Sequence, residues 1–402
     1  MRGGLGNPRL LRVLNERRLL DQLHANGPAS RADLAKITGL SKPTVSAALA
    51  GLEEDGLVHL VGEVSGRPGP VTSLYDMNAA STHVAGIDIG RDWIRVAVAD
   101  LRGTFAGRTD GRNTARDSAE LAVLVGDLCR AAAREAELDW SVIACAVVGS
   151  PGVYDPAQGR LDFAPNLPGP PDLAGRLRSA LDVELVIEND INLAAVGEHT
   201  YGEGRGKANF ALVSIGTGVG MGIVINGELY VGARGAAGEV SYVPTDSPSY
   251  IPTDSPSYVP TDSPPTDDAL AHGATETVTS APGVVRAARA AGLDLETAKE
   301  VFAVAAAGDP AARSVVEAEG RRIGGLLVAV AAVLDPEVIV LSGGVGRNLD
   351  LLGAAIEDRI AELGPLRPVV VASALGDSGV LLGAVAHARA RAWDLIFDAR
   401  QG

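Results

Sequence analysis

Two polar motifs near the middle of the chain carry side chains that could bind a polyhydroxylated ligand and an anion. Residues 188–192 (ENDIN) follow a short apolar run, at a point where a strand would lead into a helix. Short Asp, Asn and Glu side chains exchange hydrogen bonds with vicinal hydroxyl groups at little cost in rotamer entropy. Residues 216–220 (GTGVG) form a glycine-rich turn, which lets backbone N–H groups approach an anion. Together these motifs indicate a sugar kinase or a protein descended from one.

Two α/β halves over residues 79–402 are predicted to position these motifs. Residues 83–90 and 93–100 are apolar runs on either side of a short turn, a pattern typical of a β-hairpin. A second hairpin is predicted around the glycine turn, and a long helix is predicted near 312–334. Two halves that each open on a hairpin resemble the two-lobed, actin-like ATPase (sugar kinase-like) fold, in which a cleft separates the lobes.

A separate unit is predicted over residues 1–78. Apolar residues recur there at helical spacing in three short segments, and Ser30 and Ser41 stand where helix N-caps are expected. Two strands are predicted at 57–61 and 72–75, around a tip that contains glycine and arginine. This order of elements is typical of a winged helix-turn-helix, the arrangement that reads DNA.

The third helix of such a unit lies in the major groove, and the wing contacts DNA beside it. Arg67, at the wing tip, is expected to enter the minor groove or to contact phosphate. A three-helix adaptor that binds no nucleic acid is the alternative, but it does not explain why caps, turn, third helix and wing occur in order. The predicted DNA contacts are Ser41, Lys42, Thr44, Ser46 and Arg67.

The charge of the chain is divided unevenly between these two units. The net charge is −15, yet residues 1–75 contain nine Lys or Arg and seven Asp or Glu. An acidic body with a mildly basic head is compatible with DNA binding through the head alone. No apolar run has membrane-spanning length and no apolar signal core begins the chain, so we expect a cytoplasmic protein without membrane contact. Cys129 and Cys145 are the only cysteines, and free buried thiols are expected.

After the helix-turn-helix, seven motifs follow in order: GIDIG, SPG, APNLPG, ENDIN, SIGTGVGMGI, GARGAAGE and LSGGVG. This series is similar to that of the ROK family, which combines bacterial sugar-responsive repressors with sugar kinases. The resemblance covers nearly the full chain and implies the fold described above. It does not imply an activity, because the family includes both catalysts and regulators.

The resemblance implies a sugar site around Asp190. In the family's kinases the matching residue is the base that takes the proton from the attacking sugar hydroxyl. Without bound ATP, Asp190 would instead accept a hydrogen bond from that hydroxyl. A structural role, capping the helix that starts near residue 191, is the alternative. Further implied sugar contacts are Asn166, Asn189 and Glu239, with Ser150 and Gly152 on the rim of the cleft.

The first hairpin turn departs from the pattern of the family's kinases. There, a glycine and a threonine follow the first glycine and hold the ATP phosphates, but this chain has Arg91 and Asp92 after Gly90. Arg91 is bulky where backbone must approach phosphate, although its charge could bind phosphate. Asp92 adds a negative charge, and two like unit charges at 4 Å repel by about 1 kcal/mol in water. We expect no bound ATP and Mg²⁺, and Asp88 is expected to bond within the hairpin turn rather than orient a metal.

The second turn, Gly216-Thr217-Gly218, keeps the form of a phosphate loop. It could hold a nucleotide, or its glycines could serve only the tight hairpin. The glycine cluster at 343–346 is weaker evidence for a nucleotide, because short glycine runs are common.

A structural zinc site of the family is missing from this sequence. The family places a histidine three residues after the glutamate that matches Glu239, followed by three cysteines. Here that position is Tyr242 and no cysteine follows, so no zinc site and no metal are expected. A proline-rich octapeptide repeat at 241–264 occupies this place, and a mobile surface loop or a partner-docking segment are the two interpretations of it.

These features lead to the hypothesis of a sugar-responsive transcriptional regulator, a repressor rather than an enzyme. Its head would bind operator DNA as a homodimer or homotetramer, and its cleft would bind a sugar or sugar derivative. Whether the sugar releases DNA or favours DNA binding stays open. The alternative is an active ATP-dependent sugar kinase that carries a DNA-binding head.

Overall fold

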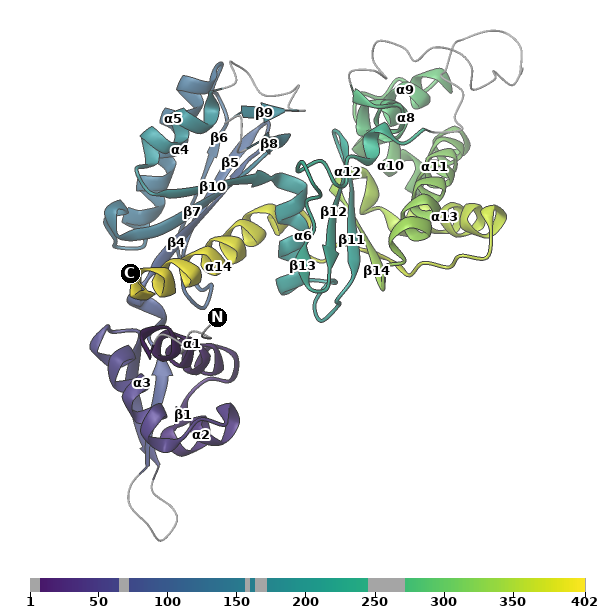
Figure 1. Cartoon of the computed structure of the whole chain (residues 1–402). Helices are drawn as coiled ribbons and strands as arrows, with labels where there is room; N and C mark the ends of the chain where they lie inside the picture. Colours follow the sequence, from purple (N-terminus) through teal and green to yellow (C-terminus); the bar gives the residue numbers. More distant parts are fainter. Residues whose placement is uncertain (1–7, 65–71, 156–159, 163–171, 245–271, 402) are drawn as a thin grey trace, which may run out of the picture.

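The computed structural model describes residues 8–64, 72–155, 160–162, 172–244 and 272–401. The chain forms a small N-terminal head and a body of two lobes, joined by the long C-terminal helix α14 (Gly379–Gln401; Figure 1). This arrangement agrees with the predicted winged helix followed by a two-lobed α/β fold.

The head is a winged helix-turn-helix. Its elements are α1 (Pro8–Asn26), β1 (Ala29–Ser30), α2 (Arg31–Thr38), α3 (Lys42–Glu54), β2 (Val58–Val64) and β3 (Thr72–Met77), with the antiparallel sheet order β1-β3-β2. Ser30 caps α2 in a reciprocal capping box with Asp33, and Ser41 caps α3 by accepting the N–H of Thr44. The predicted caps are therefore confirmed. Arg67, predicted at the wing tip, lies outside the described residues.

The first lobe is a five-stranded mixed sheet covered on both faces. Its elements are β4 (His83–Ile89), β5 (Trp93–Asp100), β6 (Phe105–Arg112), α4 (Ser118–Glu135), β7 (Ile143–Ser150), β8 (Val153–Asp155), β9 (Arg160–Asp162), α5 (Leu173–Leu181) and β10 (Glu184–Asn189). The strand order is β10-β7-β4-β5-β6, and β4 and β5 form the predicted hairpin. Helices α4 and α5 bury one face of the sheet, and α14 (Gly379–Gln401) buries the other.

The second lobe repeats this plan around the sheet β13-β12-β11-β14-β15. Its elements are β11 (Phe210–Ile215), β12 (Val219–Ile225), β13 (Glu228–Leu229), η3 (Val240–Tyr242), α8 (Ala274–Thr279), α9 (Ala281–Ala290), α10 (Ala298–Ala306), α11 (Pro310–Leu334), β14 (Val338–Ser342), α12 (Gly343–Gly346), α13 (Leu349–Leu363), β15 (Val370–Ala372) and η4 (Gly376–Ser378). Helices α9, α10, α11 and α13 bury one sheet face, and α6 (Asp190–Tyr201) packs on the other. Of the octapeptide repeat, residues 245–264 lie outside the described residues.

Helices α6 and α14 pack against each other between the lobes, and glycines set how close they come. A Cβ on Gly383 of α14 would lie 1.7 Å from the carbonyl oxygen of Leu193 in α6. A Cβ on Gly197 of α6 would lie 2.4 Å from the carbonyl oxygen of Gly379. The two helices are thus in direct backbone contact, and no larger residue fits at either glycine.

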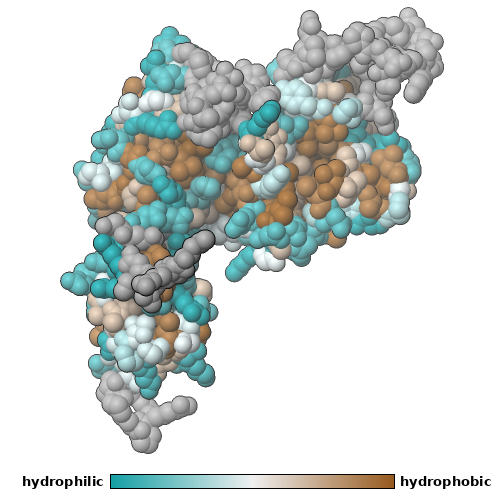
Figure 2. Space-filling view, viewed as in Figure 1, coloured by the Kyte–Doolittle hydropathy of each residue, from teal (hydrophilic) through white to brown (hydrophobic). Residues whose placement is uncertain are grey.

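Helix α14 then continues onto the head. Phe397 near its end joins the same buried cluster as Leu20 of α1 and Leu49 of α3. In Figure 2, hydrophobic residues on the visible face gather over the two lobes of the body and hydrophilic residues border them. Within the described part of the chain, no helix combines the length and the apolar composition that crossing a membrane requires.

Candidate functional site

A cleft of about 940 Å³ lies where the two hairpin turns, the start of α6 and the segment before α14 converge. This volume is in the range of small-molecule sites in proteins. Many of the residues that line it are polar or charged, including Asp88, Arg91, Asp92, Arg95, Asn189, Asp190, Glu239, Tyr242, Glu276, Arg347 and Asp377. The structure therefore brings together most of the described residues that the sequence assigned to the sugar and phosphate sites.

Asn189 holds the junction between β10 and α6 in place. Its Oδ1 accepts the N–H groups of Ile191 and Asn192, at 2.9 and 3.1 Å, and its Nδ2 donates to the carbonyl of Gly152 at 3.0 Å. The capping role considered for Asp190 therefore belongs to Asn189, one residue earlier, because the helix begins at Asp190 itself. The predicted sugar contact by Asn189 is limited to its one remaining amide hydrogen.

Asp190 occupies the first position of α6 and lines the cleft. Its Oδ1 accepts the N–H of Ile191 at 2.9 Å. Burial raises the pKa of Asp190 to about 6, and the nearby charges of Asp88 and Glu239 add to the rise. A carboxylate with a pKa close to neutrality can accept a proton or a hydrogen bond from a sugar hydroxyl.

Asp88 is paired with a cation inside the first hairpin. The register of β4 and β5 sets Asp88 directly opposite Arg95, whose Nη1 donates to Asp88 Oδ2 at 2.9 Å. Burial raises the pKa of Asp88, and the charge of Arg95 opposes that rise. Asp88 was predicted to bond within the hairpin turn; its partner instead lies on the opposite strand β5 of the same hairpin. Arg91 and Asp92 lie exposed at the turn itself, on the wall of the cleft.

A carboxylate from a different helix binds the backbone at the second turn. Gly216, Thr217 and Gly218 join β11 to β12 and line the cleft, as predicted. Immediately after them, the N–H of Val219 donates to Oε2 of Glu276 at 2.9 Å. A Cβ on Gly218 would lie 2.9 Å from the same oxygen, so glycine permits this approach. The turn thus meets a negative charge of the chain itself.

Glu276 was missed by the sequence analysis. It lies in the first turn of α8, and it is the only carboxylate between residues 269 and 293. A single carboxylate in a stretch that contains no other Asp or Glu is the signal that could have drawn attention to it. His272, which lies two residues before α8, has its Nδ1 3.7 Å from Oε1 of Glu276.

The remaining predicted sugar residues have different outcomes. Glu239 lines the cleft partly buried, and burial followed by the charge of Glu276 raises its pKa. Tyr242, which replaces the family's histidine, also lines the cleft. Gly152 lies on the rim as predicted, whereas Ser150 is fully buried in β7 and does not line the cleft. Asn166 lies outside the described residues.

Neither cysteine is available as a metal ligand at this site. Cys129 and Cys145 are free and buried in the first lobe, and burial raises the pKa of both thiols. Among the residues that the structure describes, no group of three or more His, Cys, Asp or Glu side chains could hold a metal ion.

The predicted DNA-reading residues lie at the exposed start of α3. Ser41, Lys42 and Ser46 are exposed and Thr44 is partly exposed. The hydroxyl groups of Ser41 and Thr44 lie 2.8 Å apart, so both contribute to the helix cap. Lys42 and Ser46 present their polar groups to solvent, which suits contact with phosphate or base edges.

Two family models match this chain. Residues 84–391 match the model of the ROK family, and residues 13–67 match that of the MarR family. The first match covers both lobes, and the second covers most of the head.

Three similar proteins illustrate both branches of that family. The xylose repressor of Bacillus subtilis is 30% identical over 239 residues, which are 59% of this chain and 62% of the repressor. The chain thus spans less than two thirds of that repressor. A glucokinase of Halalkalibacterium halodurans is 32% identical over 260 residues, 59% of this chain and 73% of the enzyme. A crystal structure of a ROK family transcriptional regulator, a homologue of the E. coli MLC protein, superposes with a TM-score of 0.77 at 21% identity over 98% of this chain and 99% of that chain.

Proposed function

The chain belongs to the ROK family, and on that premise we propose that it is a sugar-responsive transcriptional repressor. Its winged-helix head binds operator DNA, and its cleft binds a sugar effector at Asp190 and Glu239. Similarity to xylose repressors and to a regulator of the same overall fold supports this choice over the kinases.

The observation that carries the proposal is that the protein's own side chains make contacts at both hairpin turns where a kinase would hold the phosphates of ATP. Beside the first turn, Oδ2 of Asp88 is paired with Arg95, and this cation competes with Mg²⁺ for the carboxylate. In the second turn, Glu276 accepts the N–H of Val219 and would repel a polyphosphate. The residues at the two turns therefore suit the binding of ATP and Mg²⁺ poorly, whereas Asp190 still lines the cleft. The site favours sugar binding without phosphoryl transfer.

An active sugar kinase is the second candidate function. The raised pKa of Asp190, about 6, suits a general base that works near neutral pH, and the glycine turn is intact. Similarity to a glucokinase supports the same reading. For this function Arg91 would have to bind phosphate and offset the charges of Asp92 and Glu276.

Thermal unfolding and a coupled ADP-release assay separate the two functions. We expect D-xylose, D-glucose or N-acetyl-D-glucosamine to raise the melting temperature of the full chain, and ATP with Mg²⁺ to have no effect. DNA should bind the same protein, and the stabilising sugar should change that affinity. Sugar-dependent release of ADP would refute the non-enzymatic reading, and a lack of DNA binding would refute the regulator.

The quaternary state and location follow from this function as further parts of the proposal. A winged helix that reads a two-fold symmetric operator acts as a dimer or a dimer of dimers, with half-sites about 34 Å apart or a multiple of that distance. Operator binding requires a cytoplasmic protein. Sedimentation of the chain with and without DNA measures the assembly.

A further inference from the structure

The C-terminal helix α14 contacts the cleft at one end and the DNA-binding head at the other. Val380 in its first turn lines the cleft, as does Asp377 in the η4 turn just before it. At about 1.5 Å per residue, its 23 residues extend for about 34 Å. Figure 1 shows α14 running from the junction of the lobes to the head, where its end lies beside α1.

At the cleft end, α14 is fixed to the helix that carries Asp190. Because Gly197 of α6 and Gly383 of α14 place the two backbones in contact, the helices cannot approach further. Glu198 of α6 also accepts the N–H of Leu375, in the segment that leads into α14, at 3.3 Å. A displacement of α6 toward α14 on sugar binding would therefore move α14 as well.

Near the middle of α14, one guanidinium joins three parts of the protein. Arg389 donates from Nη1 to the hydroxyl of Tyr201 at the end of α6, at 3.0 Å. Its Nε donates to the carbonyl of Leu101 in the first lobe at 2.9 Å, and its Nη2 lies 3.2 Å from Nε2 of His24 in α1. Arg389 thus joins α6, the first lobe and the head.

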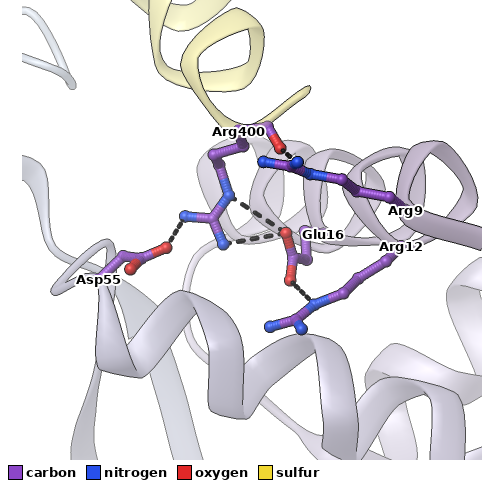
Figure 3. Close-up of polar contacts among 5 residues, drawn as sticks. All are labelled: Arg9, Arg12, Glu16, Asp55 and Arg400. Carbon is purple, nitrogen blue, oxygen red and sulfur yellow. Dashed lines mark hydrogen bonds and ion pairs between the residues drawn. The ribbon is translucent and has the colours of Figure 1, made fainter. Parts of the chain in front are cut away.

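At the far end, Arg400 lies between two carboxylates of the head (Figure 3). Its Nε and Nη2 donate to Oε2 of Glu16 in α1, at 3.1 and 2.9 Å, and its Nη1 pairs with Asp55. Arg12 binds the other oxygen of Glu16 at 2.9 Å, and Arg9 donates to the carbonyl of Arg400 at 3.2 Å. We call these five residues the Arg400 cluster.

We propose that the Arg400 cluster locks the DNA-reading head to α14, and that α14 transmits sugar binding to the head. The inference rests on the proposed function and adds the route of its regulation. Asp55 is the C-cap of α3, so Arg400 touches the helix predicted to read DNA. Glu16 is 1% exposed, and a buried carboxylate that loses its partners is strongly disfavoured. The head therefore follows α14 instead of rotating freely.

Distances between spin labels on the head and the first lobe test the lock without sugar or DNA. The labels are attached to the full chain through Lys36→Cys in α2 and Val123→Cys in α4, both exposed positions. The native cysteines are buried and do not compete for label. We expect one narrow distance distribution, whose width at least doubles in the double variant Glu16→Gln with Arg400→Gln. Because this double variant leaves no buried unpaired charge, it should still fold.

A matched control lies on the same helix. Arg391 donates to Glu184 of the first lobe at 2.6 Å and has no described contact with the head. Arg391→Gln should therefore keep the narrow distribution. A double variant as narrow as the parent would overturn the lock.

The transmission of the signal is tested by DNA affinity with and without sugar. The probes are the three sugars named above and a duplex enriched by the protein from a random DNA library. In the parent and in Arg391→Gln, the stabilising sugar should change the Kd for this duplex at least tenfold. In the double variant of Glu16 and Arg400 the change should fall below twofold, while the sugar still raises the melting temperature as in the parent.

The outcomes separate this inference from the proposed function. A double variant that retains the full sugar effect on DNA binding would overturn the transmission through α14. A parent whose DNA binding responds to no sugar would contradict the proposed function, and the transmission with it. The spin-label distances would then still decide whether the Arg400 cluster holds the head.

Discussion

Asp190→Asn should make the unliganded protein more stable at neutral pH. The pKa of Asp190 is raised from 3.8 to about 6, mainly by burial, so the folded state holds a proton more tightly than the unfolded chain. The contribution of the protonated Asp190 carboxyl to the free energy of unfolding is therefore complete below about pH 4. It is lost as the pH rises through 6, where the folded carboxyl must ionise. Asparagine stays neutral and keeps an oxygen that can accept the N–H of Ile191.

The size of the gain in stability follows from the pKa shift of Asp190. Two pKa units correspond to about 3 kcal/mol, and because Asp190 is partly accessible to solvent we expect about 1–2 kcal/mol. In a body of this size that is about 1.5–3 °C in melting temperature, because the entropy of unfolding scales with chain length. Thermal and urea unfolding of parent and variant between pH 4 and pH 8 should show stabilities that nearly coincide at pH 4, diverge between pH 4 and pH 6 and differ by a constant amount above that. The variant should at the same time lose its stabilisation by sugar.

Asp92→Asn is the matched control, because Asp92 is an exposed carboxylate on the same cleft. It should change stability by less than about 0.5 kcal/mol at every pH. If Asp190→Asn is less stable than the parent at pH 8, or differs from it equally at pH 4 and pH 8, the reasoning about a buried charge is wrong.

Three further substitutions test other parts of the structure. Lys42→Ala should weaken DNA binding by about 1 kcal/mol and lower its salt dependence, measured by fluorescence anisotropy, while sugar stabilisation is unchanged. Glu276→Ala leaves the N–H after the glycine turn without its acceptor and should cost about 1–2 kcal/mol in urea unfolding, whereas Glu276→Gln should cost less. Gly383→Ala should cost about 2–3 kcal/mol, because its Cβ meets the backbone of α6, whereas Gly325→Ala in α11 has open space and should be neutral or stabilising. A stable Gly383→Ala protein would contradict the close packing of α6 and α14.

Local features of this chain could be predicted because each depends on residues a few positions apart. Ser30 and Ser41 cap helices whose first N–H groups lie three residues away. The change from strand to helix at Asn189 and Asp190 follows from an apolar run that ends in polar residues. The pairing of Asp88 within its hairpin is local too, since Arg95 is seven residues along the chain.

The contacts that give the site its electrostatic character were decided by the tertiary fold. Glu276 reaches the glycine turn from 57 residues away, and Arg400 reaches Glu16 from 384 residues away. No periodicity or cap connects such residues, because their meeting depends on how the lobes and α14 pack. The sequence thus determined the winged helix, the two hairpins and the position of Asp190. Only the folded chain decided that Glu276 lies against the second glycine turn, and that the C-terminal helix ties the head to the cleft.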